Sequence, residues 1–151
     1  MRTTRAGDPL GSLAVADLIR VRHFRGDDVG ELVDEAVRLY PDNLLIVFRE
    51  GRYLVDHARY EEALPRFDRL LAVDLETLPD AGPAYGMAIF GALAHDGRAV
   101  CLFRLARYAE AAEAWGRAAE VEPGDTSYAA KQQLALARDA RGAGAPAGLR
   151  P

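Results

Sequence analysis

The chain has 151 residues, of which 50% are hydrophobic and 28% charged, and its formal net charge is −4. This length and composition predict one soluble globular domain with enough apolar side chains to form a core. The acidic balance argues against a nucleic-acid partner, because binding to phosphates requires an excess of basic residues.

Cys101 is the single cysteine. A lone thiol forms no internal disulfide and builds no metal site by itself, which suits a reducing compartment. No apolar run approaches the roughly 20 residues of a membrane-spanning helix. The basic start of the chain, Met1 to Arg5, is not followed by the apolar core of a signal peptide. We therefore expect a cytoplasmic protein without membrane segment, metal or cofactor.

The two ends of the chain differ from its middle. Residues 1–12 hold few apolar side chains and include Gly7 and Pro9, so we predict a flexible N-terminus. Residues 142–151 consist mainly of glycine, alanine and proline, and this composition predicts a disordered tail. The part between them, residues 13–141, is the predicted folded domain.

Residues 13–24 have two interpretations. Ile19, Val21 and His23 alternate with other residues, which indicates a short N-terminal strand or arm. The apolar run from Leu13 to Ala16 is equally suited to the start of a helix.

From Asp27 onward the spacing of apolar residues predicts helices almost throughout. The predicted helices run from a cap at Asp27 or Asp28 to Leu39, over about 43–56, 59–73, 83–105 and 109–121, and from a cap at Asp125 or Thr126 to about 141. Pro65 lies near the start of its helix, where proline is tolerated, and Pro83 suits a first helical position. Together these ranges predict an all-α fold.

Two segments of the chain match each other, namely 58–67 and 106–115, which share Ala-Arg-Tyr followed by glutamate, alanine and a large aromatic residue. This pattern resembles the tetratricopeptide repeat, a helix–turn–helix unit of 34 residues. The resemblance covers about residues 29 to 138 and implies antiparallel helix hairpins stacked into a superhelix. The residues that carry the repeat signature are Gly51, Tyr60, Ala63 and Phe67 in one copy and Ala99, Tyr108, Ala111, Trp115 and Pro123 in the next.

The signature has a steric purpose. Small residues such as Gly51 and Ala99 allow two helices to approach closely, and large aromatic residues fill the spaces between hairpins. The two copies lie 48 residues apart instead of 34, measured from Ala63 to Ala111. We assign the excess to a loop over 75–82 and to extra turns at the start of the following helix.

A second resemblance concerns the order of the segments. A strand-like stretch that ends at Phe24, a charged helix, the sequence Tyr-Pro-Asp-Asn at 40–43 and then the repeats looks like the C-terminal tail of bacterial family-2 glycosyltransferases. The nucleotide-sugar domain of those enzymes does not occur in this sequence. The resemblance therefore implies an accessory or detached region without catalytic activity of its own.

The residue types that perform catalysis are poorly arranged. His95 and Cys101 are six residues apart, which places them about 120° from a shared helix face, so they make a poor nucleophile–base pair. We expect Cys101 to act as a small buried hydrophobic residue and the chain not to be an enzyme.

The tetratricopeptide resemblance also implies a binding surface, because in that family the first helices of the hairpins line the concave face. The residues predicted to contact a partner in this groove are Phe48, Arg49, Arg52, Val100, Phe103, Arg104, Lys131 and Arg138. Five of them are basic and would attract an acidic segment, and the phenylalanines would supply apolar anchors. In the plainer interpretation, the arginines only solvate their helices and pair with neighbouring acids.

The sequence thus predicts a protein-interaction scaffold that binds a peptide or partner protein, with an acidic partner favoured. The alternatives are the glycosyltransferase-associated region and a homo-oligomer formed through an exposed repeat end or through residues 13–24.

Overall fold

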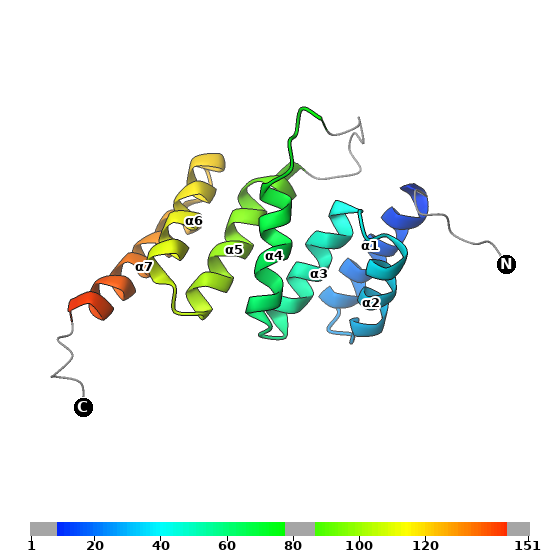
Figure 1. Ribbon diagram of the computed structural model, residues 1–151, viewed down its shortest axis with the longest axis horizontal. Helices are drawn as coiled ribbons and strands as arrows, with labels where there is room; N and C mark the ends of the chain where they lie inside the picture. Colours follow the sequence, from blue (N-terminus) through cyan, green and yellow to red (C-terminus); the bar gives the residue numbers. More distant parts are fainter. Residues whose placement is uncertain (1–8, 78–86, 145–151) are drawn as a thin grey trace.

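The computed structural model describes residues 9–77 and 87–144. This part of the chain forms seven α-helices and one short 3-10 helix (Figure 1). They are α1 (Pro9–Phe24), α2 (Gly30–Leu39), α3 (Leu44–Asp56), α4 (Tyr60–Leu71), η2 (Met87–Phe90), α5 (Ala92–Arg104), α6 (Tyr108–Val121) and α7 (Thr126–Gly144). The all-α prediction is confirmed.

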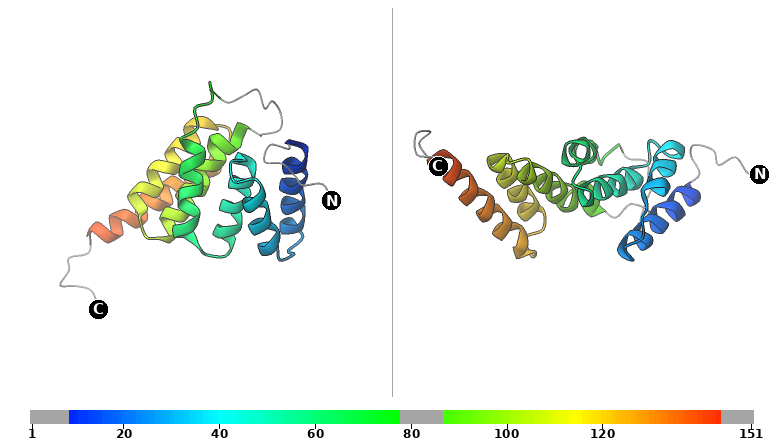
Figure 2. Two further views of the ribbon diagram at one scale, coloured as in Figure 1. Left: turned by 45° about the vertical axis from the view of Figure 1, so that its right-hand side comes forward. Right: turned by 90° about the horizontal axis from the view of Figure 1, so that it is seen from below.

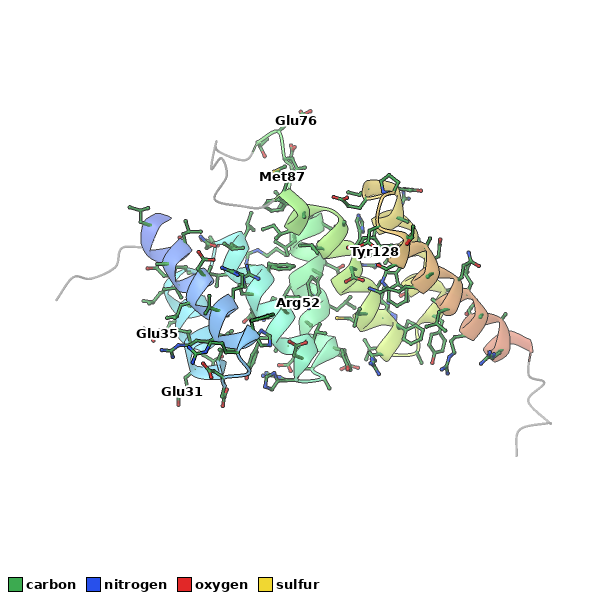
Figure 3. All side chains as sticks on the ribbon, turned by 180° about the vertical axis from the view of Figure 1, so that it is seen from behind. Glu31, Glu35, Arg52, Glu76, Met87 and Tyr128 are labelled. Carbon is green, nitrogen blue, oxygen red and sulfur yellow. The ribbon has the colours of Figure 1, made fainter. Side chains whose placement is uncertain are left out.

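The helices form consecutive antiparallel hairpins that stack in a row, α1–α2, α3–α4 and α5–α6, with α7 packed on α6. Helices α2, α4 and α6 lie on the side that faces the viewer in Figure 1, and α1, α3, α5 and α7 lie on the opposite side, which Figure 3 shows. In the right-hand view of Figure 2, both ends of the row extend below its middle. The side of α1, α3, α5 and α7 is therefore the inner side of this bend.

Of the two interpretations of residues 13–24, the strand or arm is wrong and the helix is confirmed, because this segment belongs to α1. Ser12, Ala16 and Ile19 are buried at helical spacing, and α1 packs against α2 and α3. The alternation of Ile19, Val21 and His23 was misleading, since Val21 is exposed on the opposite face of the helix from Ile19. The helix begins at Pro9, so residues 9–12 also belong to it and not to a flexible end.

Helices α2, α3, α4, α6 and α7 begin close to the predicted positions. The Asn43 side chain caps α3 by accepting the Ile46 backbone N–H at 3.1 Å. The Asp125 carboxylate accepts the Ser127 N–H at 3.0 Å before α7, and its hydrogen bonds to Ser127 lower the pKa of Asp125. The N-cap of α2 is Val29 rather than an aspartate, and Asp28 accepts the Gly30 N–H instead.

The region between α4 and α5 differs from the prediction. Instead of one long helix up to Leu105, the structure has η2, a break at Gly91 and then α5. Pro83 and most of the predicted loop, residues 78–82, lie outside the described residues. The last helix extends beyond the predicted end at 141 to Gly144.

The central contact of the fold is made by Phe67 on α4, which is fully buried between two glycines of neighbouring helices. A Cβ atom at Gly51 of α3 would lie 3.0 Å from the ring, and one at Gly97 of α5 only 2.3 Å from it. The ring also meets Phe48 edge to face, with 6.4 Å between centroids. Phe67 thus packs one hairpin against the next, and only glycine leaves room for it at residue 97.

The remaining small residues of the signature are buried as the packing argument requires. Ala63, Ala99 and Ala111 are fully buried. Trp115 occupies the place in α6 that Phe67 occupies in α4, and it packs in a second cluster with Ala99 and Ala111. Of the other signature residues, Tyr60 and Tyr108 are half-buried and Pro123 is exposed after α6.

The two matching segments also share a turn geometry. Ala58 and Ala106 have positive φ angles of 56° and 60°, although neither is glycine. After each of them, the backbone N–H of the next arginine bonds back to a leucine carbonyl of the preceding helix, at 2.9 Å for Arg59 and 2.8 Å for Arg107. This is the arrangement that usually places glycine at the left-handed position.

Replacing Gly97 with alanine should lower the free energy of unfolding by about 1–3 kcal/mol, because the new methyl group overlaps the Phe67 ring and this cost exceeds the helix propensity gained. Gly116→Ala is the matched control, since its added carbon meets only the flexible amide end of Gln132. Urea unfolding compares the two variants with the parent. A Gly97→Ala protein as stable as the parent would contradict the packing described here.

Glycine at residue 58 or 106 should raise the free energy of unfolding by about 1 kcal/mol per site, because alanine is strained in the left-handed region. Ala130→Gly, at an exposed position inside α7, should instead lower it by about 1 kcal/mol. Thermal unfolding of the three variants tests the contrast, and destabilisation by Ala58→Gly would show that the turn is not strained.

Candidate partner-binding face

Charge is divided between the two sides of the helix row. The four helices of the inner side, α1, α3, α5 and α7, carry nine basic and five acidic side chains. The three helices of the other side, α2, α4 and α6, carry four basic and nine acidic side chains. We call the exposed surface of these four helices the first-helix face, and the helices that form it are basic on balance although the whole chain has a net charge of −4.

Ion pairing differs between the two sides in the same way. Every arginine on α2, α4 and α6, and each arginine that immediately precedes α4 or α6, has a carboxylate within 4.0 Å. Among the described residues, the arginine and lysine side chains without such a partner all lie on the first helices or directly after α1. They are Arg22, Arg25, Arg49, Arg52, Arg104, Arg138 and Arg141.

Arg49 is the most confined of these arginines. It is half-buried where α3 meets α1, and its Nε atom is hidden from solvent without a hydrogen-bond partner among the described residues. Burial lowers the pKa of Arg49, and the nearby cations Arg20 and Arg52 lower it further against the opposing effect of Asp17. Figure 3 shows Arg52 near the middle of this face. An incoming carboxylate would relieve this concentration of positive charge.

The predicted apolar anchors are placed differently. Phe48 is buried in the core and packs on Phe67, so it offers no surface to a partner. Phe103 is half-buried, and its ring contacts Tyr108 and Trp115 with centroid distances of 5.1 and 5.6 Å. Val100 is also half-buried, in the same cluster. The predicted residues that remain available are mainly arginines, with Arg104 and Arg138 exposed.

Lys131 differs from those arginines because it already has a partner. Its Nζ donates to Asp96 Oδ1 at 3.1 Å and lies 5.5 Å from the Tyr128 ring centroid. The same Asp96 oxygen accepts the Trp115 indole N–H at 2.9 Å. Asp96 on α5 therefore links α6 and α7, and the Asp96 side chain is only 15% exposed. Sequence analysis missed this link, since neither spacing nor residue type reveals that Trp115 and Lys131 meet at Asp96.

A depression of about 390 Å³ lies among α4, α5 and α6, away from the predicted groove residues. Its lining consists of Leu71, His95, Arg98, Glu110, Glu113, Ala114 and Arg117. Burial, together with the positive charges of Arg117 and Arg98, lowers the pKa of His95 and keeps the ring neutral at physiological pH. Arg98 pairs with Asp68 at 2.8 Å, so part of this charge stabilises the hairpin stack.

Cys101 is a fully buried free thiol. Burial, assisted by the negative charge of Asp68, raises the pKa of Cys101 to about 11. The thiol is therefore protonated near neutral pH and a poor nucleophile. Among the described residues, no three or more histidine, cysteine, aspartate or glutamate side chains gather in a way that could hold a metal ion. None of the described helices is both long enough and apolar enough to cross a membrane.

Comparison of the chain with protein-family models, with curated proteins and with solved structures found no match.

The raised pKa of Cys101 predicts a pH dependence of stability. Since the folded-state pKa of about 11 exceeds the ordinary value of 9.0, the protonated thiol stabilises the fold fully below pH 9, and this contribution is lost as the pH rises through 11. The stability difference between the parent and Cys101→Ala should shrink by about 2 kcal/mol between about pH 7.5 and pH 10.5. Urea unfolding at both pH values measures this stability difference. A difference that stays constant would contradict the raised pKa of Cys101.

Proposed function

We propose that this chain is a protein-interaction scaffold of the tetratricopeptide kind, and that its first-helix face binds an acidic segment of a partner protein. The observation that carries the proposal is the uneven ion pairing. Arginines of the second helices all have a carboxylate partner within the chain, whereas most of those on the first helices have none among the described residues. Only Arg20 and Arg98 of the first-helix arginines are paired, with Asp17 and Asp68.

The energetics favour an acidic ligand on this face. A partner carboxylate would not have to displace an existing ion pair at Arg49, Arg52 or Arg104, so the new interaction adds to those of the free protein. Arg49 is the strongest single case, because this half-buried guanidinium lies near the cations Arg20 and Arg52 and has no carboxylate within 4.0 Å among the described residues. The net positive charge of the first helices would also attract an acidic segment before contact.

The proposed partner is a peptide or protein segment, since the described residues form a row of helices with an extended inner side. Repeat proteins of this architecture use such surfaces to bind extended ligands. A cytoplasmic setting is part of the proposal and suits the free, buried Cys101.

The triple variant Arg49→Glu, Arg52→Glu and Arg104→Glu tests the proposal. We expect the parent protein to bind a fluorescein-labelled peptide of about 15 residues, rich in glutamate, with an affinity that falls as salt increases. The triple variant should bind it at least about 10-fold more weakly, as measured by fluorescence anisotropy.

The matched control replaces Arg38, Arg59 and Arg117 with glutamate. This change alters the net charge equally, but these arginines lie on the other side and pair with glutamates three residues away. The control should bind like the parent. An equal loss of peptide affinity in both triple variants would show that only the net charge of the protein matters. A parent protein that binds no acidic peptide would refute the proposal.

A second triple variant, Arg52→Glu with Arg104→Glu and Arg138→Glu, tests the same face and leaves the half-buried Arg49 in place.

A further inference from the structure

Helix α1 is apolar on two opposite sides. One side, with Ser12, Ala16 and Ile19, is buried against α2 and α3. On the other side, apolar residues recur at intervals of four, four, three and three, which is the spacing of one continuous helix face. This face, the α1 outer stripe, consists of Leu10, Ala14, Leu18, Val21 and Phe24.

The apolar side chains of the α1 outer stripe are largely exposed to solvent. The exposed fractions are 77% for Leu10, 41% for Leu18, 43% for Val21 and 94% for Phe24. Single exposed apolar residues are ordinary, but a contiguous row along a helix marks a surface that another molecule covers. None of the described helices packs on this stripe.

The position of α1 adds weight to this observation. It is the first described helix of the row, and the terminal helices of stacked repeats need a polar outer surface when nothing covers them. Helix α7 at the opposite end has two exposed leucines, Leu134 and Leu136, but they are two residues apart and point to nearly opposite sides. Of the two ends of the described row, the α1 end is therefore the one with an apolar stripe that no described helix covers.

We infer that the α1 outer stripe of one molecule packs antiparallel against the same stripe of a second copy. The stripe is complementary to itself. In an antiparallel pair that crosses near Leu18, Phe24 of each copy lies against Leu10 and Ala14 of the other, and the small Ala14 leaves room for the ring. The two Val21 side chains then face the two Ala14 side chains.

Charge at the edge of the stripe supports the same arrangement. Asp17 and Arg20 form an exposed ion pair with 3.2 Å between Oδ1 and Nε. A two-fold axis near Leu18 brings Asp17 of each copy within reach of Arg20 of the other, so the pair can be exchanged between copies. Arg22 and Arg25 lie at or just after the C-terminal end of α1, and the antiparallel direction keeps these basic ends apart, whereas a parallel pair would place them side by side.

The contact is small. A helix of 16 residues is about 24 Å long, and one helix pair buries an area at the low end of specific interfaces. The dimer should therefore be weak, with a dissociation constant on the order of micromolar to tens of micromolar. This inference does not depend on the proposed function, because it concerns a different set of residues.

Sedimentation velocity over about 5 to 500 µM tests the inference, since this range brackets the expected dissociation constant. The parent should shift from monomer to dimer with concentration, and Val21→Glu with Phe24→Glu should weaken association at least 10-fold. The matched control, Leu134→Glu with Leu136→Glu, changes two exposed apolar residues of α7 and should associate like the parent. Circular dichroism confirms that each variant folds.

A cysteine variant tests the antiparallel direction. Leu18→Cys lies near the proposed two-fold axis and should form a disulfide-linked dimer on mild oxidation, whereas Leu136→Cys should not, and the native Cys101 is buried in both. A parent that stays monomeric throughout, a dimer that persists in the Val21→Glu and Phe24→Glu protein, or equal cross-linking at both sites would overturn the inference.

Discussion

The contact of Phe67 with Gly51 and Gly97 is the constraint on which the rest of the structure depends. The ring belongs to α4, and its neighbours belong to α3 and α5, so one side chain joins three consecutive helices. Because no side chain fits at Gly97 without displacing the ring, this contact fixes how closely the second and third hairpins approach. Trp115 continues the pattern in the next hairpin, where its indole N–H is anchored on Asp96.

This packing determines which surfaces remain for binding. Since α4 and α6 face one side of the row, α3 and α5 must face the other, and their polar side chains form the first-helix face together with those of α1 and α7. The acids of the second helices neutralise the arginines near them, and Glu50 on α3 is drawn to Arg66 on α4. The first helices thus keep an excess of unpaired cations, which suits an acidic partner, while the end of the row keeps an apolar stripe, which suits a second copy.

The sequence was sufficient for the parts of the fold that local patterns determine. The repeated Ala-Arg-Tyr segments and the small residues at 51, 63, 99 and 111 identified the stacked hairpins, because these features act within one helix pair. Residues 13–24 were ambiguous because α1 is apolar on both sides, and such a helix shows no clear period to distinguish it from a strand. The importance of Gly97 could not be seen, since it depends on a ring 30 residues away in the sequence.

For the candidate site, residue type predicted the basic character of the first-helix face but not the state of each side chain. Arg49, Arg52 and Lys131 look equivalent in the sequence, yet Lys131 is held by Asp96 and the two arginines have no ion-pair partner among the described residues. Phe48 was predicted as an anchor because it lies on a first helix, but the edge-to-face contact with Phe67 draws it into the core. These distinctions arise from contacts between helices, which a single sequence does not display.

Native-state hydrogen exchange tests the central packing claim most directly. If Phe67 joins α3, α4 and α5, the buried amides of these three helices should exchange most slowly and with one common opening free energy, while those of α1 and α7 exchange faster. Separate opening free energies for α3 and α5, or slower exchange in α7 than in α4, would contradict the claim that this ring holds the stack together.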